Sequence, residues 1–167
     1  MPDLGPAMEK HTANLNRIRG VANYQFPHNI GLAFFPDETK IGLSKKTGRI
    51  RHLYLDSTLL ATFRPNDGLF SLTIEGAKRL GVLLEPPTLR VVVRDDIEPF
   101  AKEGRNVFAR HVIRADPAIR PGEEVLVTSA ADAVLAVGKA VLTGREMLAF
   151  KRGVAVKTRR GVDQAEP

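Results

Sequence analysis

Three groups of basic side chains are the residues of this chain whose chemistry is easiest to recognise. Residues 40–51 hold five Lys or Arg and no acid, residues 102–114 hold four against Glu103, and residues 145–160 hold six against Glu146. Arginine offers phosphate a fork of donors, and lysine offers a point charge. With a net charge of +6 over 167 residues, these groups favour an anionic partner. Each group taken alone is also typical of a solvated surface.

Side chains that could support catalysis do not form a recognisable pattern. The histidines share no metal-ligand spacing; they are His11, His28, His52 and His111. Asp67 lies in an Asn-Asp-Gly turn sequence, and Asp95 and Asp96 would point to opposite faces of a strand. The chain has no GxGxxG, no P-loop, no nucleophile elbow and no cysteine. We therefore predict that it is not an enzyme and uses no cofactor or metal, with catalysis by carboxylates or histidine as the alternative.

Composition narrows the class of protein further. The hydrophobic content of 43% is ordinary for a globular chain, and no run of eighteen apolar residues occurs. The N-terminal MPDLGPAMEKH lacks the apolar stretch of a signal peptide. The absence of cysteine agrees with a reducing compartment. We expect a cytoplasmic protein that has no membrane partner.

The first half of the chain predicts a small two-layer α/β domain. Its expected elements are a helix at 7–21, a strand at 31–36, a hairpin at 41–55, a strand at 58–63 and a helix at 73–83. KKTG supplies the hairpin turn, and Thr73 can cap the second helix. EPPT at 85–88 marks the best boundary because two prolines stiffen the backbone. We place this domain at residues 1–88.

The second half predicts a small β-barrel, so the expected fold class is α+β. Its strands are expected at 89–95, 107–116, 124–129, 133–142 and 153–160, with short helices at 98–104 and 143–150. Thr143 and Glu146 form a capping-box sequence, and Gly138 indicates a close backbone approach. In about 75 residues, closure into a barrel is the natural way to remove sheet edges. We place this domain at 89–161 and expect a frayed tail at 162–167.

Several motifs in the second half resemble a PUA domain, a small pseudo-barrel found on RNA-handling proteins. They are VFARHVIRADPAIRPGEEVLV, LAVGKAVLTGREML and RGVAVKTR, and the resemblance covers residues 89–161. Upstream, YQFPHNIGLAFFP, SKKTGRIRHLYLD and TFRPNDGLFSLTIEGAKRL resemble the domain that precedes PUA in archaeal archaeosine tRNA-guanine transglycosylases. That family usually has Gly where this chain has Pro27. Its long catalytic barrel with cysteine-bound zinc has no counterpart in this sequence.

The resemblance implies an RNA-binding surface on the PUA-like half. Its expected residues are Lys102, Gly104, Arg105, Asn106, Val107, Phe108, Ala109, Arg110, Arg152, Gly153, Lys157 and Arg159. Phe108 could stack on an unpaired base or could be a core residue of its strand. The basic hairpin is a second candidate, through Lys45, Lys46, Arg49 and Arg51, because a hairpin tip can lie along an RNA backbone.

These observations predict a non-catalytic protein that binds structured RNA and is associated with RNA modification. The expected RNA is tRNA, with rRNA as an alternative. Two other interpretations remain open at this point. The chain could be the RNA-binding subunit of a split tRNA-guanine transglycosylase, docked onto a separate catalytic chain, or a ribosome-associated translation factor.

Overall fold

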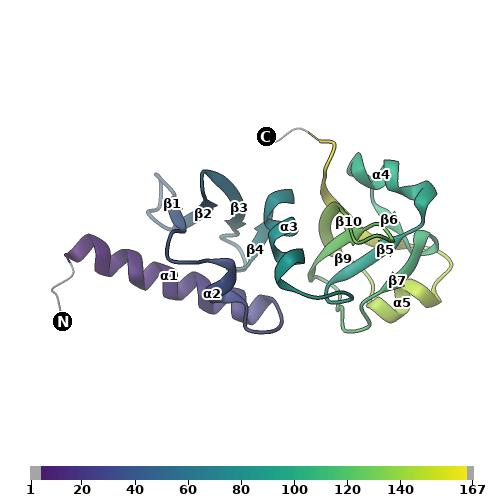
Figure 1. Cartoon of the computed structure of the whole chain (residues 1–167), viewed down its shortest axis with the longest axis horizontal. Coiled ribbons are helices and arrows are strands. Elements are labelled where there is room, and N and C mark those ends of the chain that lie inside the picture. Colours follow the sequence, from purple (N-terminus) through teal and green to yellow (C-terminus); the bar gives the residue numbers. More distant parts are fainter. Residues whose placement is uncertain (1–4, 165–167) are drawn as a thin grey trace. The chain divides into compact units, whose positions relative to one another are not determined.

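The computed structural model describes residues 5–164, and the chain divides into two compact units between Arg79 and Leu80 (Figure 1). We call residues up to Arg79 unit 1 and those from Leu80 unit 2, and each is described by itself. The mixed α and β composition confirms the predicted α+β class. Within residues 5–164, no helix is both long enough and apolar enough to cross a membrane.

Unit 1 begins with a long helix, α1, at Pro6–Gln25. Leu15, Ile18 and Ala22 are its buried residues, at the spacing of three and four that places side chains on one helix face. The helix extends beyond the predicted 7–21 and ends where Phe26 adopts an extended conformation. Pro27 explains this end, since the residue before a proline disfavours helical geometry.

The predicted strand at 31–36 is wrong, because this segment forms the short helix α2, Gly31–Phe34. The N–H of Phe34 donates to the carbonyl of Ile30 at 2.8 Å, and that of Phe35 donates to Gly31 at 2.9 Å. Phe34 and Phe35 are both fully buried. Adjacent residues of a strand point to opposite faces, whereas a helical turn lets both rings enter one core.

A four-stranded antiparallel meander, in the order β1-β2-β3-β4, completes unit 1. Its strands are β1 Lys40–Leu43, β2 Ile50–Leu55, β3 Thr58–Phe63 and β4 Phe70–Leu72. The β1–β2 hairpin confirms the prediction, and Gly48 takes a φ of 71° in its turn. Strand β4 was not predicted. The side-chain amide of Gln25 donates to the carbonyl of Phe70 at 2.9 Å and accepts its N–H at 2.7 Å.

Helix α3, Ile74–Leu83, follows the meander and contains the division between the units. Thr73 caps it as predicted, because its hydroxyl accepts the N–H of Gly76 at 3.0 Å. The end of α3 and the residues that follow it are held within unit 2 by Arg90, which is nearly fully buried. This guanidinium donates to the carbonyls of Gly81 and Leu84, at 2.7 Å each, and pairs with Asp132.

Unit 2 is a six-stranded, nearly closed β pseudo-barrel, as predicted. In the sheet order β6-β10-β9-β8-β5-β7, only the β5–β8 pair is parallel. The strands are β5 Arg90–Val93, β6 Val107–Phe108, β7 Val112–Ala115, β8 Glu124–Thr128, β9 Val134–Ala140 and β10 Val154–Gly161. The helices are α4 Glu98–Lys102 and α5 Gly144–Ala149, with 3₁₀ turns at Asp95–Ile97 and Ala109–His111. Thr143 and Glu146 form the predicted capping box of α5.

Two local predictions for unit 2 are wrong. The expected strand at 107–116 is broken by the 3₁₀ turn Ala109–His111, which separates β6 from β7. Asp95 and Asp96 lie in a 3₁₀ turn rather than in a strand. Breaking the long strand lets β6 pair with β10 while β7 pairs with β5, so a single segment serves both edges of the sheet.

The tail was predicted to be frayed over 162–167, but its first three residues are hydrogen-bonded. The N–H of Val162 donates to Leu135 at 2.9 Å, and that of Asp163 donates to the carbonyl of Lys102 at 3.0 Å. The side chain of Gln164 accepts the N–H of Gly161 at 2.9 Å. Residues 165–167 lie outside the described part of the chain.

Candidate nucleic-acid interface

The segment that joins α4 to β6 forms the floor of the candidate interface. Helix α4 ends in a turn where the N–H of Gly104 donates to Ala101 at 2.9 Å and that of Arg105 donates to Phe100 at 3.2 Å. Gly104 has a φ of 87°, in the region where a side chain is strained. This turn reverses the chain sharply and exposes Arg105 and Asn106 immediately before β6.

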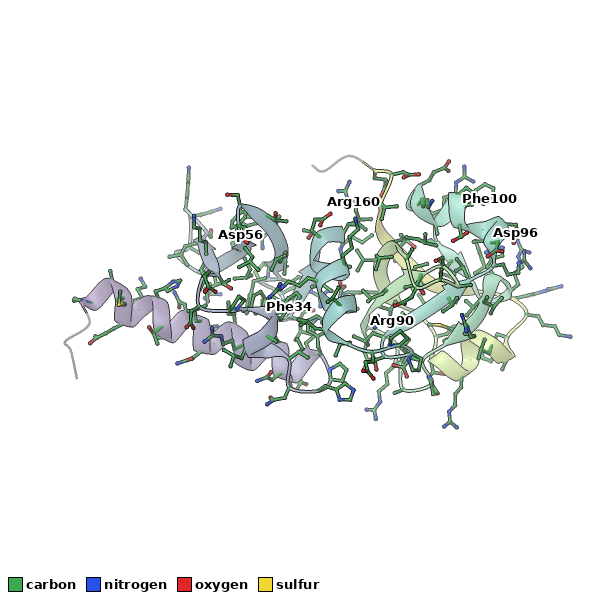
Figure 2. All side chains as sticks on the ribbon, in the orientation of Figure 1. Phe34, Asp56, Arg90, Asp96, Phe100 and Arg160 are labelled. Atoms are coloured by element: carbon green, nitrogen blue, oxygen red, sulfur yellow. The ribbon has the colours of Figure 1, made fainter. Side chains whose placement is uncertain are left out.

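A concavity of about 570 Å³ opens beside this turn, and we call it the PUA-side ledge. The residues that line it are Ile97, Phe100, Ala101, Gly104, Arg105, Asn106, Val107, Phe108 and His111. Phe100 and Phe108 are 45% and 39% exposed, which is unusual for rings in a unit with a well-packed core. Figure 2 shows Phe100 at the same end of unit 2 as Asp96. A cavity of this size suits a nucleobase with its sugar.

Arginine and histidine surround the two exposed rings. The Arg105 guanidinium lies over the Phe100 ring at 5.3 Å from its centroid, and the Arg110 guanidinium lies over Phe108 at 5.6 Å. The His111 ring meets Phe108 edge to face at 5.7 Å. Planar groups of these kinds are the ones on which unpaired bases stack. The ledge therefore presents aromatic rings and arginine donors side by side, which are the groups that a base and its phosphate would contact.

The charges around the ledge favour a neutral imidazole at His111. Partial burial lowers its pKa below the usual value, and the positive charges of Arg110 and Arg94 lower that pKa further. Arg94 is itself paired with Asp96, through two hydrogen bonds of 3.1 Å. The hydrogen bond from Arg94 in turn lowers the pKa of Asp96. Within residues 5–164, the Nδ1 atom of His111 is buried and has no hydrogen-bond partner.

Strand β10 brings the second part of the predicted surface to the ledge. The N–H of Ala109 donates to the carbonyl of Gly153 at 2.9 Å, and Val154 pairs with Phe108. The exposed Arg152 and Gly153 therefore lie next to residues 108–110. Farther along the strand, the side chain of Asn106 accepts the N–H of Thr158 at 3.1 Å, which fixes the loop onto β10.

The basic hairpin of unit 1 exposes Lys45, Lys46 and Arg49 at its tip, and Arg51 is half-buried. A second concavity, of about 710 Å³, lies beside it, and we call it the Arg17 pocket. Arg49 and Arg51 line this pocket together with Arg17 of α1, whereas the two lysines do not. In the described part of the chain, no cluster of three or more His, Asp or Glu could hold a metal ion.

Comparison with known proteins identifies both halves of the chain. Residues 16–87 match the patch-forming domain C2 of tRNA-guanine transglycosylase, and residues 89–162 match the PUA domain. The chain therefore contains a C2-type domain followed by a PUA domain. Its recognisable C2 and PUA domains thus confirm the resemblance on which the sequence analysis relied.

A curated relative and two solved structures illustrate the similarity. A tRNA-guanine(15) transglycosylase of Thermococcus onnurineus is 49% identical over 149 residues, which are 89% of this chain and 25% of the relative. A hypothetical protein of Pyrococcus horikoshii covers 91% of this chain and 92% of its own, at 20% identity and a TM-score of 0.73. A conserved PUA domain protein of Thermoplasma acidophilum covers 90% and 89%, at 19% identity and a TM-score of 0.63. The two structures support the fold, and the chain spans about a quarter of the length of the curated relatives it matches.

Most of the predicted RNA-binding residues lie in one region of the PUA domain, and three of them are not free surface side chains. Val107 and Ala109 are buried in the barrel core, so only their backbone could contact a ligand. The guanidinium of Arg159 donates to both carboxylate oxygens of Glu124, at 2.7 and 2.6 Å, and the Glu124 side chain is 1% exposed. Arg159 therefore neutralises an internal acid and is not available as a free phosphate ligand.

The remaining predicted residues of the PUA domain are accessible to different degrees. Lys157 is exposed and lies opposite Lys139 in the β9–β10 register, which concentrates positive charge there. Lys102 is half-buried. Arg105 makes one exposed, 3.4 Å ion pair with Glu103, of a kind that contributes little and is easily exchanged for phosphate. The assignment of these residues to RNA binding stays a prediction.

Two ring-bearing residues of the ledge, Phe100 and His111, were not among the predicted RNA-binding residues. Phe100 was treated only as part of a short helix, and His111 only as a histidine without metal-ligand spacing in the strand expected at 107–116. The available signal was the pair of bulky residues Phe100 and Phe108 that flank an Arg-Asn sequence after a glycine.

Proposed function

We propose that this protein is a non-catalytic, cytoplasmic RNA-binding protein that recognises structured RNA and serves RNA modification. Its RNA ligand in this proposal is tRNA. The proposal keeps the domain boundary at EPPT, with residues 1–88 as the C2-containing domain and residues 89–161 as the PUA domain. RNA contacts on the PUA domain come from Gly104, Arg105, Asn106, Phe108 and Arg110, together with Lys102, Arg152, Gly153 and Lys157.

The observation that carries the proposal is the combination of exposed rings and arginines at the PUA-side ledge. Phe100 and Phe108 could contribute stacking to unpaired bases, and Arg105 and Arg110 could contribute phosphate contacts. Shape and phosphate contacts are the usual means of recognising folded RNA. The choice of tRNA is supported by the curated relatives, which are named as tRNA-guanine(15) transglycosylases.

Binding of labelled tRNA, measured by fluorescence anisotropy over a range of salt concentrations, tests this function. We expect saturable binding to folded tRNA that exceeds binding to a DNA duplex of equal length. The affinity should fall steeply with salt, with a slope of roughly 0.7–0.9 per neutralised phosphate. Equal affinity for tRNA and the duplex would reject structured RNA as the specific ligand. Nucleoside analysis of tRNA incubated with the pure protein would reject the non-catalytic assignment if a modified nucleoside appeared.

A second candidate function is that of an RNA-binding subunit of a split tRNA-guanine transglycosylase. It is supported by the tRNA-guanine(15) transglycosylase that is 49% identical to this chain, because the matching region makes up only 25% of that relative. In this case the catalytic part would be a separate chain that docks onto this protein. Purification of the tagged protein from the source cells tests this: stoichiometric recovery of a catalytic chain supports the subunit, and recovery of RNA alone supports the independent binding protein.

A further inference from the structure

The Arg17 pocket of the C2 domain is a separate cationic site built from three elements of unit 1. Arg17 comes from α1, Ser44, Thr47 and Arg49 come from the hairpin loop, Arg51 comes from β2, and Phe63 comes from β3. Its volume of about 710 Å³ is within the usual range of small-molecule sites. No carboxylate is found among its lining residues within the described part of the chain.

Two of the three guanidinium groups of this pocket contact neutral partners. Arg17 lies over the Phe63 ring, at 5.9 Å from its centroid, and Arg51 donates from Nη1 to the carbonyl oxygen of Phe63 at 3.3 Å. Over residues 5–164, none of Arg17, Arg49 and Arg51 forms an ion pair with a carboxylate. Their charge is therefore not neutralised internally, and an incoming anion would be the first to do so.

The hairpin loop adds hydroxyl donors at the same pocket. The Ser44 hydroxyl accepts the N–H of Thr47 at 3.3 Å, and the Thr47 hydroxyl accepts the N–H of Arg49 at 3.3 Å. Because each hydroxyl oxygen accepts from the backbone, its own hydrogen stays available for an acceptor. The loop is itself closed by the Ser44 N–H, which donates to the carbonyl of Arg49 at 2.7 Å. Hydroxyls and arginines that face one cavity are suited to phosphate oxygens.

An apolar wall distinguishes this pocket from a simple anion site. Phe63 is half-buried and Ile50 is buried, and both line the same cavity as the arginines. A bare phosphate would leave this wall without a partner, whereas a nucleoside phosphate would cover it with its base. Lys45 and Lys46 extend from the same hairpin but do not line the pocket, so they add positive charge nearby without contacting a ligand in it.

We propose that the Arg17 pocket binds one unstacked nucleotide, with its phosphate between Arg17, Arg49 and the Thr47 hydroxyl and its base against Phe63. The nucleotide belongs to the RNA that the protein recognises, so this inference rests on the proposed function. A free mononucleotide has the same chemistry and is the other source to test. The pocket is a second RNA contact, in addition to the ledge of the PUA domain.

Two double variants that each remove two positive charges distinguish binding in the pocket from general attraction to the positive charge of the hairpin. Arg17→Ala with Arg49→Ala removes two pocket donors, and Lys45→Ala with Lys46→Ala removes two charges from the hairpin tip. All four side chains are exposed, so both variants should fold, and thermal unfolding followed by circular dichroism checks this. Arg51 is left intact because its hydrogen bond to Phe63 supports the sheet.

Anisotropy titrations with labelled tRNA give the first readout. We expect the arginine pair to lower affinity about 10- to 30-fold and the lysine pair at most about threefold. Equal losses in the two variants, with tRNA binding by the native protein intact, overturn the pocket and leave the proposed function standing. Absence of tRNA binding by the native protein overturns the proposed function, and the RNA nucleotide proposed here with it.

Titration with AMP and with inorganic phosphate, followed by amide NMR shifts, identifies the source of the nucleotide. Weak AMP shifts at Thr47, Gly48 and Arg49, larger than those from inorganic phosphate and lost in the arginine variant, support a nucleoside phosphate site. If AMP binds tightly to the native protein and the arginine variant keeps its tRNA affinity, the ligand of the pocket is a free mononucleotide and not RNA. Equal shifts from AMP and inorganic phosphate would contradict the role of the apolar wall.

Discussion

The PUA-side ledge and the Arg17 pocket use the same residue types in opposite proportions. The ledge exposes two phenylalanine rings beside a half-buried imidazole, and its two nearby arginines lie over those rings. The pocket contains one half-buried ring and three arginines without carboxylate partners among the described residues. Stacking on rings depends little on salt, whereas phosphate contacts depend on it strongly. The comparison teaches that two basic surfaces of similar charge can make contributions of different physical kinds.

The largest effect should come from reversing charge at the ledge. Arg105→Glu with Arg110→Glu places two carboxylates where phosphate is expected, and we predict a loss of tRNA affinity of about 100-fold, or about 3 kcal/mol. Anisotropy titration measures it. Lys78→Glu with Arg120→Glu makes the same change in net charge at positions that line neither cavity, and should cost at most about threefold. Similar losses in both variants would mean that net charge alone governs binding.

Removing Arg159 should affect stability far more than RNA binding, which would separate it from the ledge arginines. Arg159→Ala leaves the buried Glu124 carboxylate without its bidentate partner, and we expect about 2–3 kcal/mol of destabilisation, reduced by the partial exposure of Arg159. Urea unfolding measures this change. Lys157→Ala, an exposed change on the same strand, should stay within about 0.5 kcal/mol. A large loss of tRNA affinity in folded Arg159→Ala would mean that Arg159 contacts RNA after all.

Loss of a ledge ring should weaken binding without changing its salt dependence. Phe100→Ala and Phe108→Ala each remove a stacking surface, for which we predict about tenfold weaker tRNA binding, or about 1–2 kcal/mol. The slope of affinity against salt should equal that of the native protein, because no phosphate contact is lost. Phe150→Ala, a change at a similarly exposed ring outside both cavities, serves as the control. A reduced salt slope in the Phe100→Ala variant would mean that phosphate contacts were lost together with stacking, which contradicts the stacking role of the ledge.

The smallest effect concerns pH and His111, which only the ledge contains. Its pKa in the folded protein lies below the unfolded value of 6.5, because of burial, Arg110 and Arg94. Below pH 6.5 the unfolded chain takes up this proton first, so the site destabilises the fold as pH falls. We expect His111→Gln to flatten the stability profile slightly between about pH 7 and about pH 5, measured by urea unfolding. An unchanged profile would mean that His111 titrates as it does in the unfolded chain.

Local signals in the sequence were sufficient for much of the fold. The turn glycine Gly48, the Thr73 cap and the Thr143–Glu146 capping box each involve residues within a few positions of one another. The strand prediction for GLAFFP, residues 31–36, was wrong because a short apolar run does not distinguish a buried strand from a buried helical turn. The break at Ala109–His111 was also missed. There burial switches from the odd positions Val107 and Ala109 to the even position Val112, a change of phase that a strand cannot accommodate.

The candidate site was predictable in its composition but less so in its contacts. The basic segments at 40–51 and 102–114 were evident from the sequence, and residues of both line cavities. The Arg159–Glu124 pair could not be read, since it joins residues 35 positions apart on strands that are not neighbours in the sheet. Arg17 likewise enters its pocket only through the packing of α1 against the meander. Spacing in the sequence carries no information on such long-range contacts.

The bonds between Gln25 and Phe70 have a consequence for how other chains can approach the C2 domain. β4 ends the meander, and an unpaired strand is a template on which a foreign strand can add. The Gln25 amide offers one donor and one acceptor in the place where such a strand would bind. It thereby mimics one peptide unit and blocks β-augmentation and amyloid-like stacking at that position. A companion protein would have to recognise this domain by its side chains rather than by extending its sheet there.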